Sequence, residues 1–157
     1  MYKRQLYKLA DNFVIFHLKF IKNKNISKAP INWGNIVKSQ SWISWSGLAF
    51  ERLCFAHIPQ IKKALKLEAI ECVVAPWSKK DDQEGSQIDL LIDRADRIIN
   101  VCEIKFANSD YVITKDYAKK LRNKIQLFSN LKTNKRKSIF LTMITTCLLY
   151  TSPSPRD

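Results

Sequence analysis

The sequence predicts an α/β domain in which helices flank a mixed central sheet. Three observations predict this class. The chain has 157 residues, enough for one domain with a real hydrophobic core. Hydrophobic residues make up 46% of it, a fraction too high for a disordered basic tail. Helical and β-prone segments follow one another in the order helix, strand, hairpin, helix, strand.

The first 41 residues predict helical structure followed by a connection. Residues 2–21 mix aromatic residues and leucines with basic residues, which indicates one amphipathic helix or two short ones. A turn-like stretch follows from Lys22 to Ser27, and Pro30 to Gly34 break the pattern again. We therefore expect residues 22–41, which are rich in Lys and Asn, to form a linker.

Two helices, a strand and a loop are expected next. The first helix extends from about Ser46 to Ile58, where Pro59 ends it, and a shorter one extends from Ile61 to Leu67. Ala69 to Ala75 are apolar and β-prone, which predicts a strand. Pro76 to Ser86 are mostly polar and predict a loop.

The C-terminal half predicts a hairpin, a helix and a last strand. β-prone runs from Gln87 to Asp93 and from Ile98 to Phe106 are joined by a short turn, which is a hairpin signal. Thr114 to Phe128 carry an apolar stripe at helical spacing, and residues 138–146 are again β-prone. Leu148 to Asp157 show neither the helical nor the strand periodicity of hydrophobic residues. We interpret them as a non-native tail, produced by a frameshift or by a translated cloning or sequencing scar.

The charge of the chain favours an anionic partner. Lys and Arg number 27 against 14 Asp and Glu, so the net charge is +13. Such an excess is typical of proteins that bind nucleic acid or an anionic membrane surface, although lysines that only keep a protein soluble give the same count. Acidic residues concentrate between residues 42 and 100, where a carboxylate site or a solvated loop around Asp81, Asp82 and Glu84 explains them.

Cysteine spacing and hydropathy exclude several classes. The four cysteines form no CxxC pair, and only two histidines accompany them, which argues against a structural zinc site. Lys19 interrupts the N-terminal apolar run, and the run from Ile139 to Tyr150 is shorter than the roughly 20 residues that cross a bilayer. We expect buried thiols, a cytoplasmic protein and no membrane partner.

Strand alternation brings two carboxylates of the hairpin together. Gln87, Asp89 and Asp93 lie on one face of the first run, and Glu103 and Lys105 lie on the same face of the second. With the turn centred on Asp96, Asp89 and Glu103 become direct cross-strand neighbours, about 5 Å apart at the backbone. Two carboxylates in that relation repel each other unless the lysine or a divalent cation compensates. Mg²⁺ suits such a site, because it binds one or two carboxylates together with waters and a substrate phosphate.

Glu51 is a third candidate ligand. It lies in a predicted helix that is apolar nearly all round, so its carboxylate needs a partner. An ion pair with Arg52 or another basic residue explains Glu51 equally well. A hairpin whose polar face merely meets water is an equally simple explanation of the other two carboxylates.

These residues resemble a known signature. Gly85-Ser86-Gln87-Ile88-Asp89 followed by Glu103-Ile104-Lys105 is similar to the D…(D/E)xK signature of the PD-(D/E)XK nuclease superfamily. Glu51 matches a glutamate that these proteins often place on the helix before the sheet, and the order α-β-β-β-α-β is their restriction-endonuclease-like core. The stretch from Trp42 to Glu51 with both hairpin strands further resembles the C-terminal domain of archaeal-type AAA ATPases of the DUF234-like group.

The resemblance implies a division of the chain, because it covers roughly Tyr2 to Thr146. Residues 1–41 correspond to the end of an upstream linker or winged-helix region, residues 42–147 to the nuclease-like domain, and residues 148–157 to the tail. The sequence has no GxxxxGK[ST] phosphate loop, so the resemblance makes the chain a C-terminal fragment whose partner is an upstream AAA-type ATPase module.

The resemblance also implies roles. Asp89 and Glu103 become ligands of Mg²⁺ or Mn²⁺, Glu51 a further ligand or an outer-shell residue, and Lys105 the group that positions or activates the attacking water. Gln87 stands where many of these nucleases have a glutamate, and is a polar neighbour of the site. A basic stripe on the helix after the second strand is suited to tracking a phosphate backbone, although it is also typical of a solvated helix face; it consists of Lys115, Lys119, Lys120, Arg122 and Lys124.

The expected function is metal-dependent hydrolysis of DNA phosphodiester bonds. Two alternatives stay open. One is a catalytically inactive nuclease-like domain that binds DNA or a partner protein within the ATPase assembly, and the other is a basic module that binds only protein. Trp42 and Trp45 are suited to stacking on bases, but aromatic residues beside an apolar helix are more often part of a core or an interface.

Overall fold

The computed structural model describes residues 9–22, 24, 30–79, 86–131 and 134–151. The helices are α1 (Asn12–Phe16), the π-helical turn η1 (His17–Ile21), α2 (Trp33–Ile36), α3 (Gln40–Ala56), α4 (Ile58–Ala64) and α5 (Lys115–Ser129). The strands are β1 (Cys72–Lys79), β2 (Ser86–Arg94), β3 (Ile98–Lys105), β4 (Tyr111–Ile113), β5 (Ser138–Thr145) and β6 (Leu149–Thr151). The chain divides into two compact units, Met1–Ala56 and His57–Asp157.

Helices in the N-terminal unit begin at polar caps. The helical structure expected over residues 2–21 is present from Asn12 onward. Asp11 caps it, because its side chain accepts a hydrogen bond of 2.7 Å from the amide of Val14. Its first residues lie outside the described range. α3 begins earlier than the predicted Ser46, because Ser39 Oγ accepts a hydrogen bond of 3.2 Å from the amide of Trp42 and caps it. The short helix α2 was not predicted.

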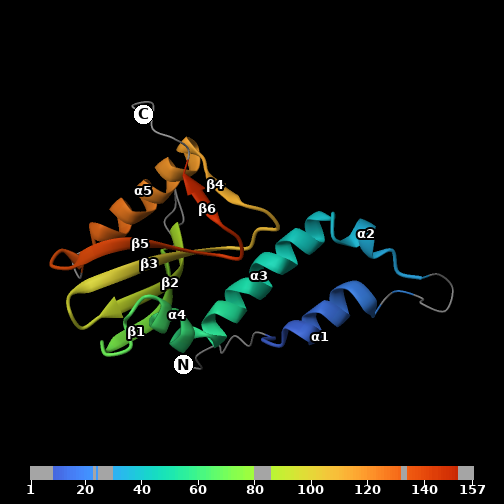
Figure 1. The fold of residues 1–157 in the computed structure, drawn as a ribbon, viewed down its shortest axis with the longest axis horizontal. Coiled ribbons are helices and arrows are strands. Elements are labelled where there is room, and N and C mark those ends of the chain that lie inside the picture. The colour runs from blue at the N-terminus through green and yellow to red at the C-terminus, as the bar shows by residue number, and fades with distance from the viewer. Residues whose placement is uncertain (1–8, 23, 25–29, 80–85, 132–133, 152–157) are drawn as a thin grey trace, which may run out of the picture. The chain divides into compact units, whose positions relative to one another are not determined.

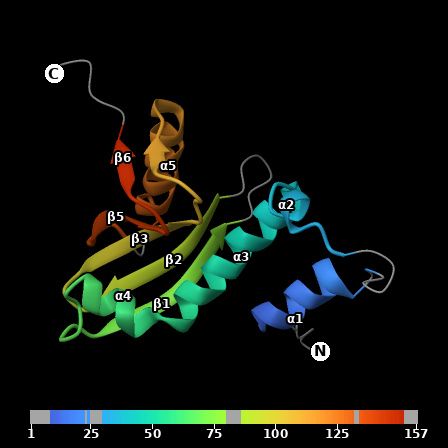
Figure 2. The same ribbon diagram turned by 45° about the vertical axis from the view of Figure 1, so that its right-hand side comes forward.

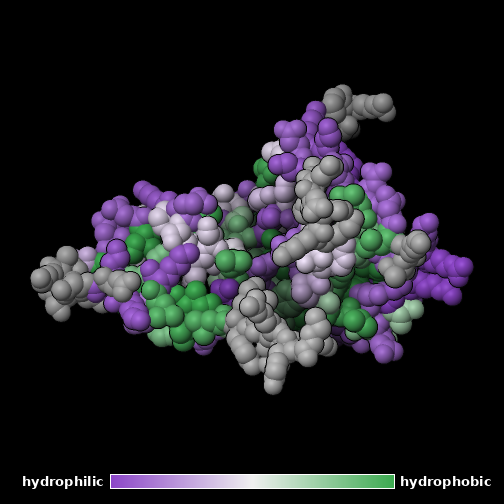
Figure 3. Space-filling view, turned by 180° about the vertical axis from the view of Figure 1, so that it is seen from behind, coloured by the Kyte–Doolittle hydropathy of each residue, from purple (hydrophilic) through white to green (hydrophobic). Residues whose placement is uncertain are grey.

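Aromatic rings form the interior of the N-terminal unit. Phe16 packs on Trp33, Trp42 and Trp45 with ring centroids 5.4 to 6.3 Å apart, and Trp42 and Trp45 lie 5.1 Å from each other. Phe20, only 5% exposed, completes the cluster. This packing favours the core interpretation of the two tryptophans over base stacking. Over α1, apolar side chains also reach the surface (Figure 3).

The C-terminal unit is built on a mixed four-stranded sheet with the order β1-β2-β3-β5 (Figure 1). β1 pairs with β2 and β2 with β3 in antiparallel fashion, whereas β5 joins β3 in parallel. The α/β class and the mixed sheet are therefore as predicted. β3 is one of the two inner strands, and its residues from Ile99 to Ile104 are all buried.

The predicted hairpin is confirmed together with its register. Leu90 pairs with Cys102 and Asp93 with Ile99, which centres the turn on Asp96. In the turn, the amide of Arg97 donates to the carbonyl of Arg94 at 3.2 Å, and Arg97 has a φ of 65°. A left-handed residue after the turn is a common way to close a hairpin.

β1 differs from the prediction because it continues through Pro76 to Lys79, where a loop was expected. β1 is an edge strand, and an edge strand tolerates a residue that has no amide hydrogen. The register with β2 shifts between Ala75 and Trp77, which marks a bulge. The bulge also interrupts the alternation expected for β2, since Ile88 packs with Ile99, Val101 and Phe128.

α5 covers one face of the sheet (Figures 1 and 2). Thr114 caps it by accepting a hydrogen bond of 3.3 Å from the amide of Tyr117. Leu121 and Phe128 of the predicted apolar stripe are buried, and Phe128 stacks edge-on against Trp77 at 5.2 Å. The hydrophobic core of this unit therefore lies between α5 and the sheet.

Two short strands were not predicted. β4 pairs in parallel with β6, from Tyr111 opposite Leu149 to Ile113 opposite Thr151. Leu149–Thr151 belong to the segment interpreted above as a tail, and they nevertheless form a strand. Pairing with β4 supplies the backbone hydrogen bonds of a segment that has no periodicity of its own.

The state of the cysteines and the apolarity of the helices can be compared with the expectations from the sequence. All four cysteines are free thiols; Cys54 and Cys102 are buried, and Cys72 and Cys147 are half-buried. In the described part of the chain, no helix combines the length and apolarity needed to cross a membrane.

Candidate active site

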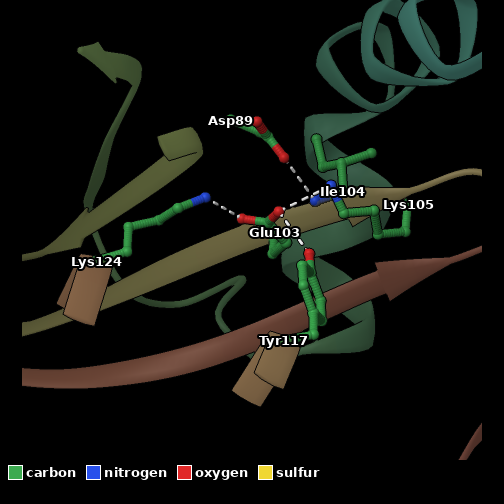
Figure 4. A network of polar contacts seen from close by, with 6 residues as sticks. All are labelled: Asp89, Glu103, Ile104, Lys105, Tyr117 and Lys124. Carbon is green, nitrogen blue, oxygen red and sulfur yellow. Dashed lines mark hydrogen bonds and ion pairs between the residues drawn. The ribbon is translucent and has the colours of Figure 1, made fainter. Parts of the chain in front are cut away.

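The hairpin places Asp89 beside the inner strand β3. The ladder between β2 and β3 extends to Leu90 and Cys102, so Asp89 and Glu103 lie one step beyond its last pair. There the Asp89 carboxylate replaces a ladder partner, because its Oδ2 accepts a hydrogen bond of 2.9 Å from the amide of Ile104 (Figure 4). The side chain of Asp89 is thereby fixed to the backbone of the strand that carries Glu103.

Glu103 is the centre of a network of polar side chains (Figure 4). Its side chain is only 5% exposed. Oε1 accepts a hydrogen bond of 2.7 Å from the Tyr117 hydroxyl and forms an ion pair of 2.9 Å with Lys105 Nζ. Oε2 forms an ion pair of 2.6 Å with Lys124 Nζ. We call Asp89, Glu103, Lys105, Tyr117 and Lys124 the Glu103 cluster.

The cluster keeps Glu103 ionised. Burial by itself raises the pKa of this carboxyl, but hydrogen bonds from Lys124, Lys105 and Tyr117 outweigh burial and hold the pKa below its usual value. The pKa of Lys105 is raised: burial lowers it, yet the hydrogen bond to Glu103 and the charges of Glu103 and Asp89 more than compensate. The pKa of Tyr117 is raised by burial and by the Glu103 carboxylate, which accepts a hydrogen bond from the Tyr117 hydroxyl.

Asp89 behaves in the opposite way. Burial raises the pKa of its carboxyl, and the charge of Glu103 raises it further, whereas the Ile104 amide, Lys105 and Lys124 only partly offset this. The two acids predicted to share a face thus have pKa values moved in opposite directions. A carboxylate with a raised pKa gains most from an additional cation, so Asp89 is the more strongly unsatisfied of the two.

The remaining residues singled out from the sequence are Gln87, Glu51 and Gly85. Gln87 is exposed on β2, and no described contact joins it to the Glu103 cluster. Glu51 lies half-buried on α3 in the N-terminal unit, where burial and its charge raise the pKa of the Cys54 thiol to about 11. Its role as a third ligand stays a prediction. Gly85, which belongs to the signature, lies outside the described residues.

The basic stripe of α5 is divided between solvent and site. Four of its members are exposed, namely Lys115, Lys119, Lys120 and Arg122. Lys124 is half-buried and turned to Glu103, as the ion pair shows. Sequence reasoning assigned Lys124 to the exposed stripe and left Tyr117 undecided. One signal was available: Lys124 follows Tyr117 at a spacing of seven and Leu121 at three, which is the spacing of the buried face.

The donor set of the cluster fits a hard divalent cation. Asp89 and Glu103 offer carboxylate oxygens, the ligands that Mg²⁺ prefers. No described residue donates to Asp89 Oδ1, whereas Glu103 Oε2 is occupied by Lys124. Among the described residues, no three His, Cys, Asp or Glu side chains gather into a metal cluster. A cation bound at Glu103 Oε2 would compete with the Lys124 ammonium for that oxygen.

Comparisons with known proteins leave the site to be judged on its geometry. A scan against protein-family models, a search of curated proteins and a search of solved structures each found no match.

A pocket of about 260 Å³ lies away from the Glu103 cluster, beside Glu71, Cys72, Asp93, Arg94, Arg97 and Lys137. The chemistry-bearing residues predicted from the sequence do not line it.

Proposed function

We propose that the C-terminal unit is a PD-(D/E)XK nuclease-like domain with a restriction-endonuclease-like core, and that it hydrolyses DNA phosphodiester bonds with Mg²⁺ or Mn²⁺. The observation that carries the proposal is the Glu103 cluster. Asp89, Glu103 and Lys105, which match the signature, interact within one network. The sheet supports it as well, because two antiparallel strands carry the acids and a parallel strand follows the helix.

The residues of the cluster divide the chemistry between them. Asp89 and Glu103 would hold the metal ion, which when bound stabilises charge on a phosphate and lowers the pKa of water. The Lys105 ammonium lies 2.9 Å from Glu103 Oε1, so it is held at the edge of the carboxylate pair and can orient an attacking water or the phosphate. The exposed lysines and arginine of α5 would contact the DNA backbone.

The partner of this domain belongs to the same proposal. The resemblance to DUF234-like ATPases makes an upstream AAA-type ATPase module the natural partner within a longer chain. ATP would then be hydrolysed there, and the present chain would supply the nuclease-like part. Association of the two is tested by co-purification of the chain with a separately expressed ATPase module of that group.

A plasmid assay tests the activity. Wild type should convert supercoiled plasmid to nicked or linear DNA in Mg²⁺ or Mn²⁺, and Asp89→Asn and Lys105→Met should lower the rate roughly a hundredfold or more. Asp93→Asn is the matched control, since Asp93 lies on the same strand and also pairs with a lysine, Lys137. Intact plasmid after incubation with folded wild type and either cation contradicts the nuclease function.

A catalytically inactive nuclease-like module is the second candidate, and one observation favours it. Both oxygens of Glu103 already have cationic partners, so this carboxylate is satisfied without a metal ion. Such a module would bind DNA or a partner protein of the ATPase assembly. It predicts DNA affinity that falls with salt and declines in Lys119→Gln and Lys120→Gln, without any cleavage.

A further inference from the structure

Lys124 holds a position that a divalent cation would need. Its ammonium lies 2.6 Å from Glu103 Oε2, the oxygen that no other residue of the cluster contacts. Lys105 and Tyr117 both bind Oε1 instead. The two oxygens of one carboxylate are thus divided: Oε1 has two partners, Lys105 of β3 and Tyr117 of α5, and Oε2 has one, Lys124 of α5.

Charge balance makes one lysine expendable. Asp89 and Glu103 together carry two negative charges when ionised, and Lys105 and Lys124 carry two positive charges. A divalent cation added to this set leaves an excess of two positive charges in a site that is only slightly exposed. One ammonium must therefore leave for the cation to bind well.

Lys124 is the lysine that can leave. Lys105 shares Oε1 with Tyr117, and its ammonium also lies 5.6 Å from the centre of the Tyr117 ring. Among the described residues of the cluster, Lys124 contacts only Glu103, and the 22% exposure of its side chain, against 35% for Lys105, still gives it a path to water. Its four-carbon stem lets the ammonium swing towards water without any movement of α5.

On these grounds we propose that Lys124 is an exchangeable counter-ion, which occupies the cation position on Glu103 Oε2 and is displaced when a divalent cation binds. The inference rests on the proposed metal site and adds a positioning residue that sets its affinity. The released ammonium joins the exposed basic residues of α5, Lys120 among them, and is then available to a phosphate group. Cation binding and phosphate binding become coupled through one side chain.

Titration of the full chain with Mg²⁺ and Mn²⁺ tests the exchange. Isothermal titration calorimetry would compare wild type with Lys124→Met, which keeps the apolar stem without the charge. We expect the variant to bind either cation about tenfold more tightly, the usual size of coupling between two linked binding events. Lys124→Arg, which keeps the charge, should not bind more tightly than wild type. Lys135→Met is the matched control, because Lys135 is exposed and belongs neither to the Glu103 cluster nor to the basic stripe of α5.

Lysine side-chain NMR follows the exchange in wild type itself. The Lys124 CεH₂ signal, assigned by its loss in Lys124→Met, should move on addition of Mg²⁺ to wild type as the ion pair opens. The inference is overturned if wild type binds Mg²⁺ while this signal stays fixed, or if Lys124→Met binds cations no more tightly than wild type. If neither protein binds a cation, the proposed metal site fails together with it. Asp89→Ala, which should abolish binding, shows whether an observed cation is in this site.

Discussion

Two lysine–carboxylate groups on the same sheet have similar bond lengths and different surroundings. The Glu103 cluster contains ion pairs of 2.6 and 2.9 Å around a side chain that is 5% exposed. Near the other end of β2, Lys137 lies 2.6 Å from Asp93, whose side chain is 39% exposed, and Arg94 pairs with Asp96. We call these four residues the Asp93 cluster.

The difference separates structural ion pairs from a site that requires explanation. Exposed pairs such as those of the Asp93 cluster contribute only about 0 to 1 kcal/mol and are common on any surface. Burial of Glu103 has a desolvation cost that its partners must offset, and apolar residues of similar volume would often be as stable. A buried charged network with a second, poorly satisfied carboxylate beside it is therefore the better candidate for function.

Removing the centre of the buried cluster should have the largest effect. Glu103→Ala leaves the Tyr117 hydroxyl and the ammonium groups of Lys105 and Lys124 without their acceptor, and loss of the acceptor of a buried polar group costs about 1 to 3 kcal/mol. Urea denaturation, with the free energy of unfolding as the readout, measures it. A loss below about 1 kcal/mol would mean that water screens the Glu103 cluster as it does an exposed pair.

Acid should remove the contribution of Glu103 progressively. Its folded-state pKa is lowered, so the stabilisation is present above the ordinary glutamate pKa and is lost as pH falls through the lowered value. Asp89 has the opposite sign, because its raised pKa makes protonation favour the folded state as pH falls.

The two contributions can be measured separately. The difference in unfolding free energy between Asp89→Asn and Asp89→Asn/Glu103→Gln should be large at neutral pH and shrink on acidification. A difference that stays constant from neutral pH to below the ordinary glutamate pKa contradicts the assignment of a lowered pKa to Glu103.

Replacing Asp89 should separate stability from function. Asp89→Asn keeps an oxygen that can accept from the Ile104 amide and removes a charge whose burial is unfavourable. We expect the stability to change by less than about 1 kcal/mol, or to rise slightly, while cation binding is lost. Thermal unfolding and calorimetric titration on one preparation test this. A strongly destabilised variant would identify Asp89 as a structural residue.

The smallest effect is expected in the Asp93 cluster. A double-mutant cycle with Asp93→Asn and Lys137→Met should give a coupling energy of about 1 kcal/mol or less, and salt should reduce it. Neither variant should alter cation binding. A coupling as large as that between Glu103 and Lys124 would remove the distinction between the two clusters.

The parts of the fold with strong local signals were predictable. Alternation and turn position gave the β2–β3 hairpin with its register, and helical spacing behind Thr114 gave α5. β1 was shortened because proline usually argues against a strand, and only the position at the sheet edge makes Pro76 acceptable. Whether a strand lies at the edge of a sheet depends on which distant segments pair with it, and the local sequence pattern does not show those partners.

The site was predictable to a similar degree. Asp89, Glu103 and Lys105 follow from strand periodicity and resemblance, and the structure brings them together. Tyr117 and Lys124 come from a helix whose rotation about its axis is decided by packing against the sheet. A lysine at the boundary of the buried face of a helix is predicted to be exposed to solvent unless the rotation of the helix about its axis is known.

The hydrogen bond from the Ile104 amide to Asp89 makes the backbone of β3 a sensor of the site. Any ligand that draws the Asp89 carboxylate towards itself loosens the hold on one amide proton in the middle of the unit. Exchange of that proton with deuterium, or its chemical shift, would then record occupancy at a position that itself takes no part in binding. The chain thus contains its own probe, which can be followed in the absence of a substrate.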